Sequence, residues 1–251
     1  MERSLPRSRR DGSCMTSDLI NHINFDSISY NKAWKIQEEL HAKRVSNQIN
    51  DTILLLEHNP VFTLGKRVCP EDIKSSIDSI KAQGIEIIQA NRGGRITYHG
   101  PGQLVCYFIC SIDSMLKTSY KTQDTDLKGI KKFVWLLEEL CIKVLAEYNI
   151  SGTRDPLHPG IWIGRDKIAA IGLHINNGVT QHGLSFNVNC NLEHYKHIVP
   201  CGIADRGITS LSLLTTNTPS IHEIKIKFLD YIAEIFEKKV VKNTLTHLQQ
   251  R

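Results

Sequence analysis

The stretch RITYHGPGQLVCYFIC, residues 95–110, contains two strand-like runs that are separated by a Gly-Pro-Gly break. In its second half, apolar residues stand at both the even and the odd positions. A strand that is apolar on both faces is typical of a sheet that is covered on both sides, and the break favours a sharp chain reversal. We therefore expect two strands here, of which the second is buried on both faces.

Amphipathic helices are predicted on both sides of this stretch. The clearest is residues 127–148, where apolar residues repeat every three or four positions and charged residues fill the opposite face. The same periodicity predicts helices over 31–46 and 221–238. Pro70 suits the first turn of a shorter helix, which we expect over 70–83.

The remaining apolar runs are short and predict strands. Residues 52–57 and 85–89 are bounded by polar residues or glycine. Three further runs are joined by tight turns, and one of these turns contains Asn177-Gly178, a strong hairpin signal. The three runs are 160–164, 167–175 and 180–189. Strands linked by hairpins, with helices set apart from them, favour an α+β fold over a doubly wound sheet.

The length and composition are those of one globular domain. The chain has 251 residues, of which 41% are hydrophobic and 23% charged, and it contains no internal repeat or low-complexity linker. This is enough apolar material for one sizeable core. We expect a single folded domain over residues 19–241, a disordered or targeting tail over 1–18 and a C-terminal tail over 242–251.

The charge pattern and the apolar pattern each exclude a class of partner. The formal net charge is +5, but no basic run is interleaved with aromatic residues, so we expect no nucleic-acid partner. A membrane span needs roughly 18 or more consecutive apolar residues. The sequence has no such run, so we expect no membrane partner.

The seven cysteines are irregularly spaced and form no paired CxxC motif. An odd number of cysteines without a secretory leader indicates free thiols in a reducing compartment. We therefore expect a cytoplasmic protein, or a mitochondrial or plastid one if the Arg-rich start MERSLPRSRR is a transit peptide.

The first candidate for chemistry is the loop RGGRITYHGPGQ, residues 92–103. Gly93 and Gly94 let the backbone approach a ligand closely, because no Cβ intervenes. A plain turn between two strands needs fewer glycine and proline residues than this stretch has, which favours a ligand-binding loop. A phosphate-binding loop is the rival hypothesis, although neither GxxxxGKS/T nor GxGxxG is present.

The second candidate is the segment GRDKIAAIG, residues 164–172. Its lysine, Lys167, stands at the turn of a predicted hairpin. Solvation is the ordinary fate of a lysine in such a turn. On local sequence alone, a solvated Lys167 is therefore the expected outcome.

The third candidate is Cys201, in HIVPCGIADRG, residues 197–207. It can pack as a buried thiol, bind zinc together with His194 and His197, or act as a nucleophile. Pro200 breaks the helix that would place the three possible zinc ligands on one face. A nucleophilic thiol needs a nearby cation that lowers its pKa from about 8.5. The local sequence does not show which cation is near.

Six blocks of the sequence, taken in order, resemble the lipoyl(octanoyl) transferases, which move an octanoyl group from acyl carrier protein to a lysine of a lipoyl domain. The similarity extends over about residues 27–212 and rests on these blocks. Lys66 departs from the family pattern, where arginine is usual, as do Asn59, where proline is common, and Ser185, where alanine is frequent. The blocks are EHNPVFTLGK (57–66), RGGRITYHGPGQLVCY (92–107), GIWIGRDKIAAIGLHI (160–175), HGLSFNV (182–188), VPCGI (199–203) and GITSL (207–211).

The resemblance implies a fold like that of the biotin and lipoate protein ligases, a single α+β domain of mixed, mainly antiparallel sheets with flanking helices. It implies that residues 19–241 form an octanoyltransferase catalytic domain, with Cys201 as the nucleophile and Lys167 as its catalytic partner. The residues that it implies for the acyl pocket are Arg92, Gly93, Gly94, Arg95, Ile96, Thr97, Tyr98, His99, Ala170, Ile171, Gly172, Gly183, Leu184 and Ser185.

The resemblance also implies the reaction and the partners. An acyl-thioester on the cysteine splits one transfer into two easier steps. The whole transfer is implied to be the first step of endogenous protein lipoylation. The implied partners are octanoyl-acyl carrier protein, the lipoyl domains of 2-oxoacid dehydrogenases and the glycine cleavage H protein. No metal or other cofactor is expected, because a thioester is already activated. The alternatives are an ATP-dependent lipoate or biotin protein ligase of the same fold and a non-catalytic module that binds zinc or a carrier protein.

Overall fold

The computed structural model describes residues 18–119 and 127–243. The tails expected over 1–18 and 242–251 therefore lie outside the described residues, except at their inner ends. Among the described helices, none is both long enough and apolar enough to cross a membrane.

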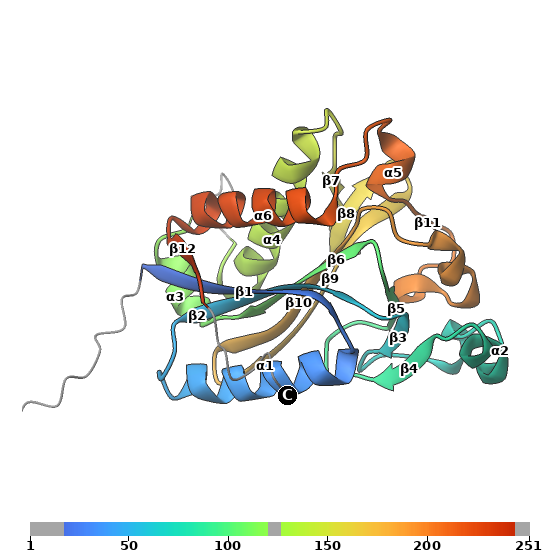
Figure 1. The fold of residues 1–251 in the computed structure, drawn as a ribbon, viewed down its shortest axis with the longest axis horizontal. Coiled ribbons are helices and arrows are strands. Elements are labelled where there is room, and N and C mark those ends of the chain that lie inside the picture. The colour runs from blue at the N-terminus through green and yellow to red at the C-terminus, as the bar shows by residue number, and fades with distance from the viewer. Residues whose placement is uncertain (1–17, 120–126, 244–251) are drawn as a thin grey trace, which may run out of the picture.

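A large mixed sheet forms the centre of the molecule (Figure 1). Its strand order is β12-β1-β2-β6-β10-β9-β8-β7, and β11 pairs with β9. The pairs β1–β12, β1–β2 and β9–β11 are parallel, and the other pairs of this sheet are antiparallel, as predicted for the fold. The strands are β1 (Leu19–Ile28), β2 (Asp51–His58), β6 (Gln103–Ile109), β7 (Thr153–Arg154), β8 (Gly160–Ile163), β9 (Asp166–Asn176), β10 (Val179–Asn187), β11 (Gly207–Ile208) and β12 (Lys239–Lys242).

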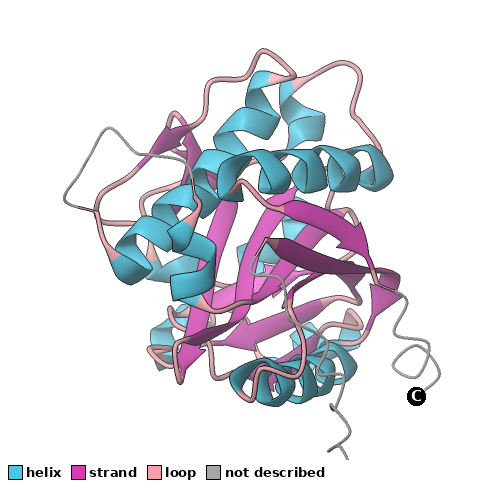
Figure 2. Cartoon of the chain, turned by 90° about the vertical axis from the view of Figure 1, so that its left-hand side faces the viewer, coloured by secondary structure: helices cyan, strands magenta, loops and turns pink. Residues whose placement is uncertain are grey.

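Helices cover both faces of the large sheet (Figures 1 and 2). On one face lie α4 (Gly129–Ala146) and α6 (Ile221–Phe236), and on the other lies α1 (Tyr30–Val45). In β6, the even-numbered residues from 104 to 108 pack in the core below α4 and α6. The odd-numbered residues from 105 to 109 pack in the core with α1. The prediction of a strand buried on both faces is therefore confirmed, and the three long helices begin and end within two residues of their predicted bounds.

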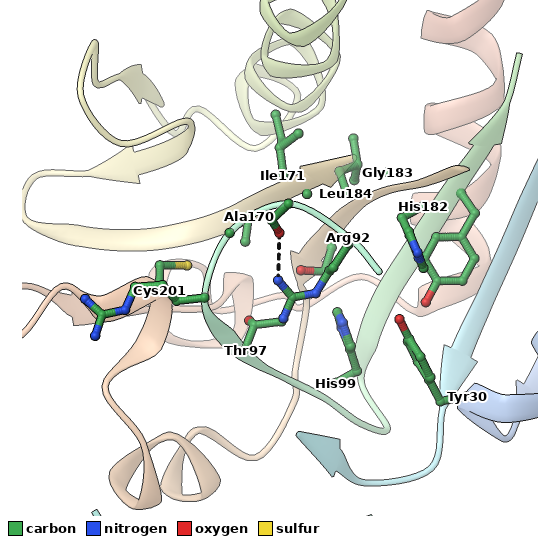
Figure 3. Close-up of a pocket in the computed structure, with 16 residues that line it drawn as sticks. Tyr30, Arg92, Thr97, His99, Ala170, Ile171, His182, Gly183, Leu184 and Cys201 are labelled. Atoms are coloured by element: carbon green, nitrogen blue, oxygen red, sulfur yellow. Dashed lines mark hydrogen bonds between the residues drawn. The ribbon is translucent and has the colours of Figure 1, made fainter. Parts of the chain in front are cut away.

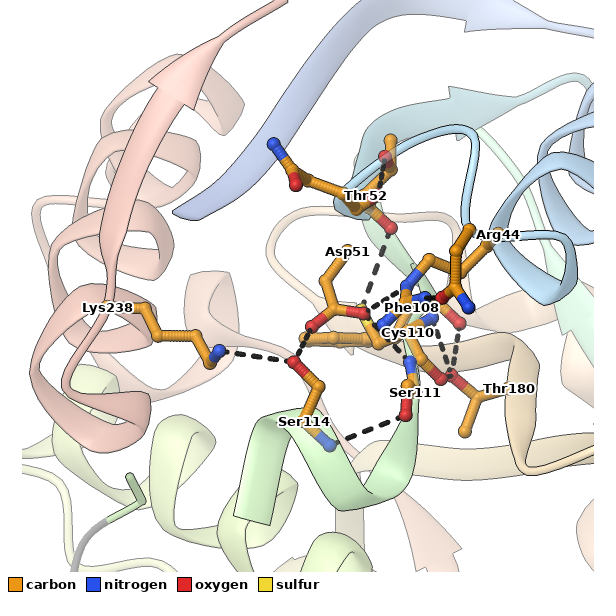
Figure 4. Close-up of polar contacts among 11 residues, drawn as sticks. Arg44, Asp51, Thr52, Phe108, Cys110, Ser111, Ser114, Thr180 and Lys238 are labelled. Atoms are coloured by element: carbon orange, nitrogen blue, oxygen red, sulfur yellow. Dashed lines mark hydrogen bonds and ion pairs between the residues drawn. The ribbon is translucent and has the colours of Figure 1, made fainter. Parts of the chain in front are cut away.

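One buried carboxylate joins α1, β2 and the short helix α3 (Ile112–Lys117), as Figure 4 shows. Asp51, the first residue of β2, accepts hydrogen bonds from Arg44 Nε at 2.7 Å and from the backbone N–H of Ser111 at 2.8 Å. The hydroxyl of Ser114 donates to its second oxygen at 2.7 Å. Because a buried charge is costly unless it is paired and hydrogen-bonded, this network fixes where α1 ends relative to the sheet.

A second, three-stranded sheet lies beside the first and consists of β4 (Glu86–Gln89), β3 (Val61–Leu64) and β5 (Ile96–His99). Its own small core contains Ile96 and Tyr98 of β5 together with residues of η2 (Leu192–His197). Successive side chains of a strand point to opposite faces. Thr97 and His99 therefore face away from this core, and they line the space between the two sheets.

The single helix expected over residues 70–83 is wrong. The segment forms two short helices, η1 (Pro70–Asp72) and α2 (Ile77–Ala82). Between them, Ile73 makes a β-bridge to Ile198, which draws the backbone out of the helical conformation. The remaining short helices are η3 (Pro200–Gly202) and α5 (Leu211–Leu214).

Candidate active site

A pocket lies between the two sheets (Figure 3). Its walls come from the loop before β5, from β5 itself, from the middle of β9 and β10, and from the turn that contains Cys201. The structure thus brings together most of the residues expected for the acyl pocket. These are Arg92, Gly93, Gly94, Arg95, Thr97, His99, Ala170, Ile171, Gly172, Gly183, Leu184 and Ser185.

Two of the residues expected in the pocket lie elsewhere. Ile96 and Tyr98 are buried in the core of the small sheet, on the face of β5 opposite Thr97 and His99. The resemblance implies all of residues 92–99 as one continuous segment, whereas a strand presents only every second side chain to a given face.

Two facing glycines line the pocket. Gly172 of β9 pairs with Gly183 of β10. A Cβ on Gly172 would lie 3.3 Å from Arg92 Cδ and from the carbonyl oxygen of Gly93, both at the pocket wall. A Cβ on Gly183 would lie 2.1 Å from the carbonyl oxygen of Cys106, which is too close for any side chain. The loop is held to this site by the N–H of Gly93, which donates to the carbonyl of Leu173 at 2.9 Å.

The side chain of Arg92 is buried in the pocket wall, and neutral groups hold it. It donates to the hydroxyl and the carbonyl of Thr63, at 2.8 and 2.5 Å, and to the carbonyl of Gly93 at 2.9 Å. Desolvation lowers the pKa of the guanidinium from its ordinary value. Since the pKa of arginine is normally above 12, the group stays charged and places a cation beside the pocket.

Cys201 stands at the mouth of the pocket in a strained turn. Its φ of 57° lies in the left-handed region, which costs a residue with a side chain about 1–2 kcal/mol. Strained backbone of this kind is frequent at functional sites. The next residue, Gly202, leaves room for the Arg95 side chain, which a Cβ on Gly202 would meet at 2.4 Å. Arg95 in turn pairs with the buried carboxylate of Asp72 through Nη2 at 2.6 Å, and this pair braces the turn.

Lys167 faces Cys201 from the neighbouring strand. Its Nζ lies 3.9 Å from Cys201 Sγ, donates to the carbonyl of Pro159 at 3.1 Å and lies 4.6 Å from the centre of the Trp162 ring. A register shift between β8 and β9 falls beside Ile168, and such bulges redirect side chains near active sites. Only 4% of Lys167 is exposed. The expectation that this lysine is solvated in its turn is therefore wrong.

The opposite end of the pocket is closed by buried aromatic and histidine rings. The ring of Tyr30 lies parallel to that of His99 at 6.3 Å and to that of His182 at 6.4 Å. His58 donates through Nδ1 to the carbonyl of Ile28, so its Nε2 accepts from the hydroxyl of Tyr107, each at 2.7 Å. We call Tyr30, His58, His99, Tyr107 and His182 the blind-end cluster.

Burial keeps the histidines of the blind-end cluster neutral. Desolvation lowers the pKa of His58 to about 4 and that of His182 to about 3, and it holds the pKa of His99 well below its usual range. The pocket contributions of Tyr30 and Tyr107 were not expected from the sequence. Tyr30 comes from the first turn of α1, and no local pattern marks that turn as part of the pocket.

The histidines of the zinc hypothesis have other partners. The Nδ1 atom of His194 lies 2.8 Å from the hydroxyl of Tyr98, and that of His197 lies 2.8 Å from the hydroxyl of Ser75. Within residues 18–119 and 127–243, no three histidine, cysteine or acidic side chains are grouped so that they could hold a metal ion. The six cysteines of this part of the chain are free thiols.

Comparison with known proteins adds three findings. Residues 29–233 match the family described as "Lipoyl protein ligase A/B catalytic domain". The chain is 40% identical over 222 residues to an octanoyltransferase of Caldicellulosiruptor saccharolyticus, covering 88% of this chain and 90% of that protein. It is 41% identical over 224 residues to an octanoyltransferase of Alkaliphilus metalliredigens, covering 89% and 98%.

Among solved structures, a putative lipoate protein ligase of T. acidophilum with bound lipoic acid is similar in fold. The TM-score is 0.67, the sequence identity is 13%, and the match covers 92% of this chain and 91% of that one. The expected fold is therefore confirmed.

Proposed function

The chain belongs to the lipoyl protein ligase A/B catalytic domain family, and from this premise we infer how its pocket works. The chain is an acyltransferase that transfers octanoyl groups. We propose further that the donor is octanoyl-acyl carrier protein and that the acceptor is a lysine of a lipoyl domain, in 2-oxoacid dehydrogenases and in the glycine cleavage H protein. The free thiols support a reducing compartment, which we propose is the cytoplasm.

One observation is the main support for this proposal: the ammonium group of Lys167 lies 3.9 Å from the thiol of Cys201 at the mouth of the pocket. A cation beside a cysteine favours its thiolate, which is the nucleophilic form. A thioester carbonyl that enters with its acyl chain in the pocket would meet this thiolate first.

In the first half of the proposed reaction, the Cys201 thiolate attacks the carbonyl carbon of the donor thioester. The bond between that carbon and the carrier's sulfur breaks, and the sulfur leaves with the bonding electron pair. Lys167 gives the departing thiolate a proton and becomes neutral. The octanoyl group is then a thioester of Cys201.

In the second half, the acceptor lysine attacks this thioester as a neutral amine. Lys167, still neutral, takes the proton that the amine loses as the amide bond forms. The bond to Cys201 Sγ breaks, and the cysteine leaves as a thiolate beside the regenerated ammonium. Each group returns to its starting state, and neither half requires ATP or a metal.

The pocket supports an acyl chain of limited length. Burying a methylene contributes roughly 0.8 kcal/mol, so a chain of eight carbons gains several kcal/mol from the wall between Ile171 and Leu184 and the glycines beside it. Three members of the buried blind-end cluster, Tyr30, His99 and His182, lie at the end of the pocket away from Cys201 (Figure 3). We propose that the chain enters at Cys201 and that its methyl end stops at Tyr30.

The experiment that tests this function uses the full-length protein with octanoyl-acyl carrier protein and a purified lipoyl domain, without ATP. We expect octanoyl transfer to the lipoyl domain, measured by its intact mass. The result that would overturn the proposal is modification only when free octanoate and ATP replace the carrier-bound substrate, because that result identifies a ligase.

A further inference from the structure

Glu138 is a buried carboxylate that lies behind Lys167. Among the described residues, it makes no hydrogen bond to that lysine or to Cys201. It lies in the middle of α4 and is 6% exposed. Its Oε1 accepts a hydrogen bond from the backbone N–H of Gly160 at 3.0 Å. A buried carboxylate is costly unless its partners compensate it, so its presence next to the reacting pair calls for a reason.

The hydrogen bond from Gly160 leads to Lys167 through one peptide group. The N–H of Gly160 and the carbonyl of Pro159 belong to the same planar unit. The N–H donates to Glu138, and the carbonyl accepts from Lys167 Nζ at 3.1 Å. Fixing one end of a rigid plane fixes the other, so the carboxylate sets the position of the acceptor that holds the lysine.

Glycine is required at the hinge of this arrangement. Gly160 has a φ of 129°, a conformation that residues with side chains rarely adopt. A Cβ there would lie 2.4 Å from the carbonyl oxygen of Ala169 and 3.4 Å from Lys167 Nζ. The φ angle and the Ala169 carbonyl therefore exclude a side chain at residue 160, and the peptide keeps its place beside the lysine only with glycine there.

The charges from Glu138 through the Pro159–Gly160 peptide to Lys167 are aligned. The carboxylate faces the positive end of the peptide dipole, and the negative end of that dipole faces the ammonium of Lys167. Each of these contacts polarises and strengthens the next. Desolvation raises the pKa of Glu138, while the Gly160 hydrogen bond and the cations Arg154 and Lys167 oppose that rise. Arg154 Nε lies 3.4 Å from the second oxygen of Glu138 and balances its charge.

We propose that Glu138 is a positioning residue, which holds the Pro159–Gly160 peptide so that Lys167 is aimed at Cys201. The inference rests on the proposed roles of the lysine and the cysteine. What it adds is that a carboxylate on α4, which is hydrogen-bonded to neither Lys167 nor Cys201, controls how reactive the Cys201 thiol is.

The test compares Glu138→Leu, Glu138→Gln and the matched control Glu139→Gln. Glu139 is the next residue of the same helix and also pairs with Arg154, but the Gly160 N–H donates to Glu138. The measurement is the rate at which iodoacetamide alkylates Cys201 as a function of pH, with the alkylated residue assigned by peptide mass. This measurement needs no acyl donor, so it can fail or succeed independently of octanoyl transfer.

We expect Glu138→Leu to move the alkylation midpoint to higher pH and to slow acylation on the order of 10-fold, as loss of a supporting partner typically does. Glu138→Gln keeps an oxygen acceptor of the same shape and retains most of the rate, and Glu139→Gln leaves the alkylation profile unchanged. In a Lys167→Ala background, Glu138→Leu should have no further effect, because both changes remove one interaction.

Two results for Glu138→Leu would overturn the inference. One is a folded Glu138→Leu protein with the wild-type alkylation profile. The other is a Glu138→Leu effect that persists in full in the Lys167→Ala background, which would show that the carboxylate acts independently of the lysine. Where Glu138→Leu does not fold, the Glu138→Gln protein decides the question, because an alkylation profile shifted as far as that of Lys167→Ala contradicts a role based on the hydrogen bond.

Discussion

Polar side chains lie near both ends of the pocket, yet those at the two ends differ in charge. At the mouth, Lys167 lies against a thiol, and a carboxylate on α4 lies behind it. At the blind end, the histidines have carbonyl, amide and hydroxyl partners, and burial lowers their pKa values. A cation with a carboxylate behind it suits proton transfer, whereas neutral rings form a wall that an acyl chain can contact.

The largest effect that this comparison predicts is at the mouth. Lys167→Ala should lower the rate of Cys201 acylation by roughly 10²- to 10⁴-fold, the usual contribution of a general acid. Single-turnover kinetics with octanoyl-acyl carrier protein measure this rate. Lys196→Ala, which removes a lysine whose side chain is 72% exposed, serves as the control and should leave the acylation rate unchanged. An unchanged acylation rate in Lys167→Ala would contradict the contrast between the two ends.

The next effect concerns the space between the ends. Gly172→Ala places a methyl group 3.3 Å from Arg92 Cδ, inside the acyl pocket. We expect kcat/KM for octanoyl donors to fall on the order of 10-fold, the equivalent of losing room for one to two methylenes. Butanoyl donors should be affected much less and act as the internal control. Equal losses for both chain lengths would indicate that the acyl chain does not lie along Gly172.

The blind end predicts a pH dependence of stability. The pKa of His182 is lowered to about 3 in the folded chain, against about 6.5 when unfolded. Between these values the unfolded chain binds a proton that the folded chain does not. The free energy of unfolding therefore falls as the pH drops below about 6.5, by up to about 1.4 kcal/mol per pH unit for one such histidine.

Urea unfolding at a series of pH values between 7 and about 5 measures this slope. His182→Gln should make it shallower, and His222→Gln, an exposed position on α6, should not. A slope that stays the same in His182→Gln would show that this imidazole is not held neutral.

The smallest effect is expected from Tyr30→Phe. The Tyr30 hydroxyl is buried and finds no hydrogen-bond partner in the described part of the chain. Removing an unpaired buried hydroxyl is close to neutral for stability. We expect a thermal midpoint equal to or slightly above that of the wild type and an acylation rate within about twofold. A large loss of the acylation rate would show that the Tyr30 hydroxyl takes part in the chemistry, contrary to this prediction.

The parts of the fold that periodicity determines could be predicted from the sequence. In the helix α4, the apolar residues recur at the helical period. The strand β6 is instead a short continuous apolar run, and its length and the Gly-Pro-Gly break before it indicate a buried strand. The strand β1 was missed. It mixes polar and apolar residues and pairs in parallel with strands far away in sequence, and such pairing leaves no local signal.

The site could be predicted only in part for the same reason. Nothing near Lys167 indicates that it is buried, since its burial follows from a bulge beside it and from Trp162, which pairs with it across β8 and β9. That Lys167 acts together with Cys201 is predicted by the resemblance of six blocks to a known family. The spacing of the two residues in the sequence does not predict it. For Ile96 and Tyr98 the sequence does hold a signal, because the alternation of side chains along a strand places them on the opposite face of β5 from Thr97 and His99.

Intact-mass spectrometry shows whether Cys201 carries the octanoyl group between donor and acceptor. The full-length protein is incubated with octanoyl-acyl carrier protein in the absence of a lipoyl domain, and peptide mapping locates any adduct. We predict one octanoyl group on Cys201 of the wild type, its loss when a lipoyl domain is added, and no adduct in Cys201→Ala. An octanoyl adduct of equal yield in Cys201→Ala, or transfer to the lipoyl domain by that variant, would contradict the account.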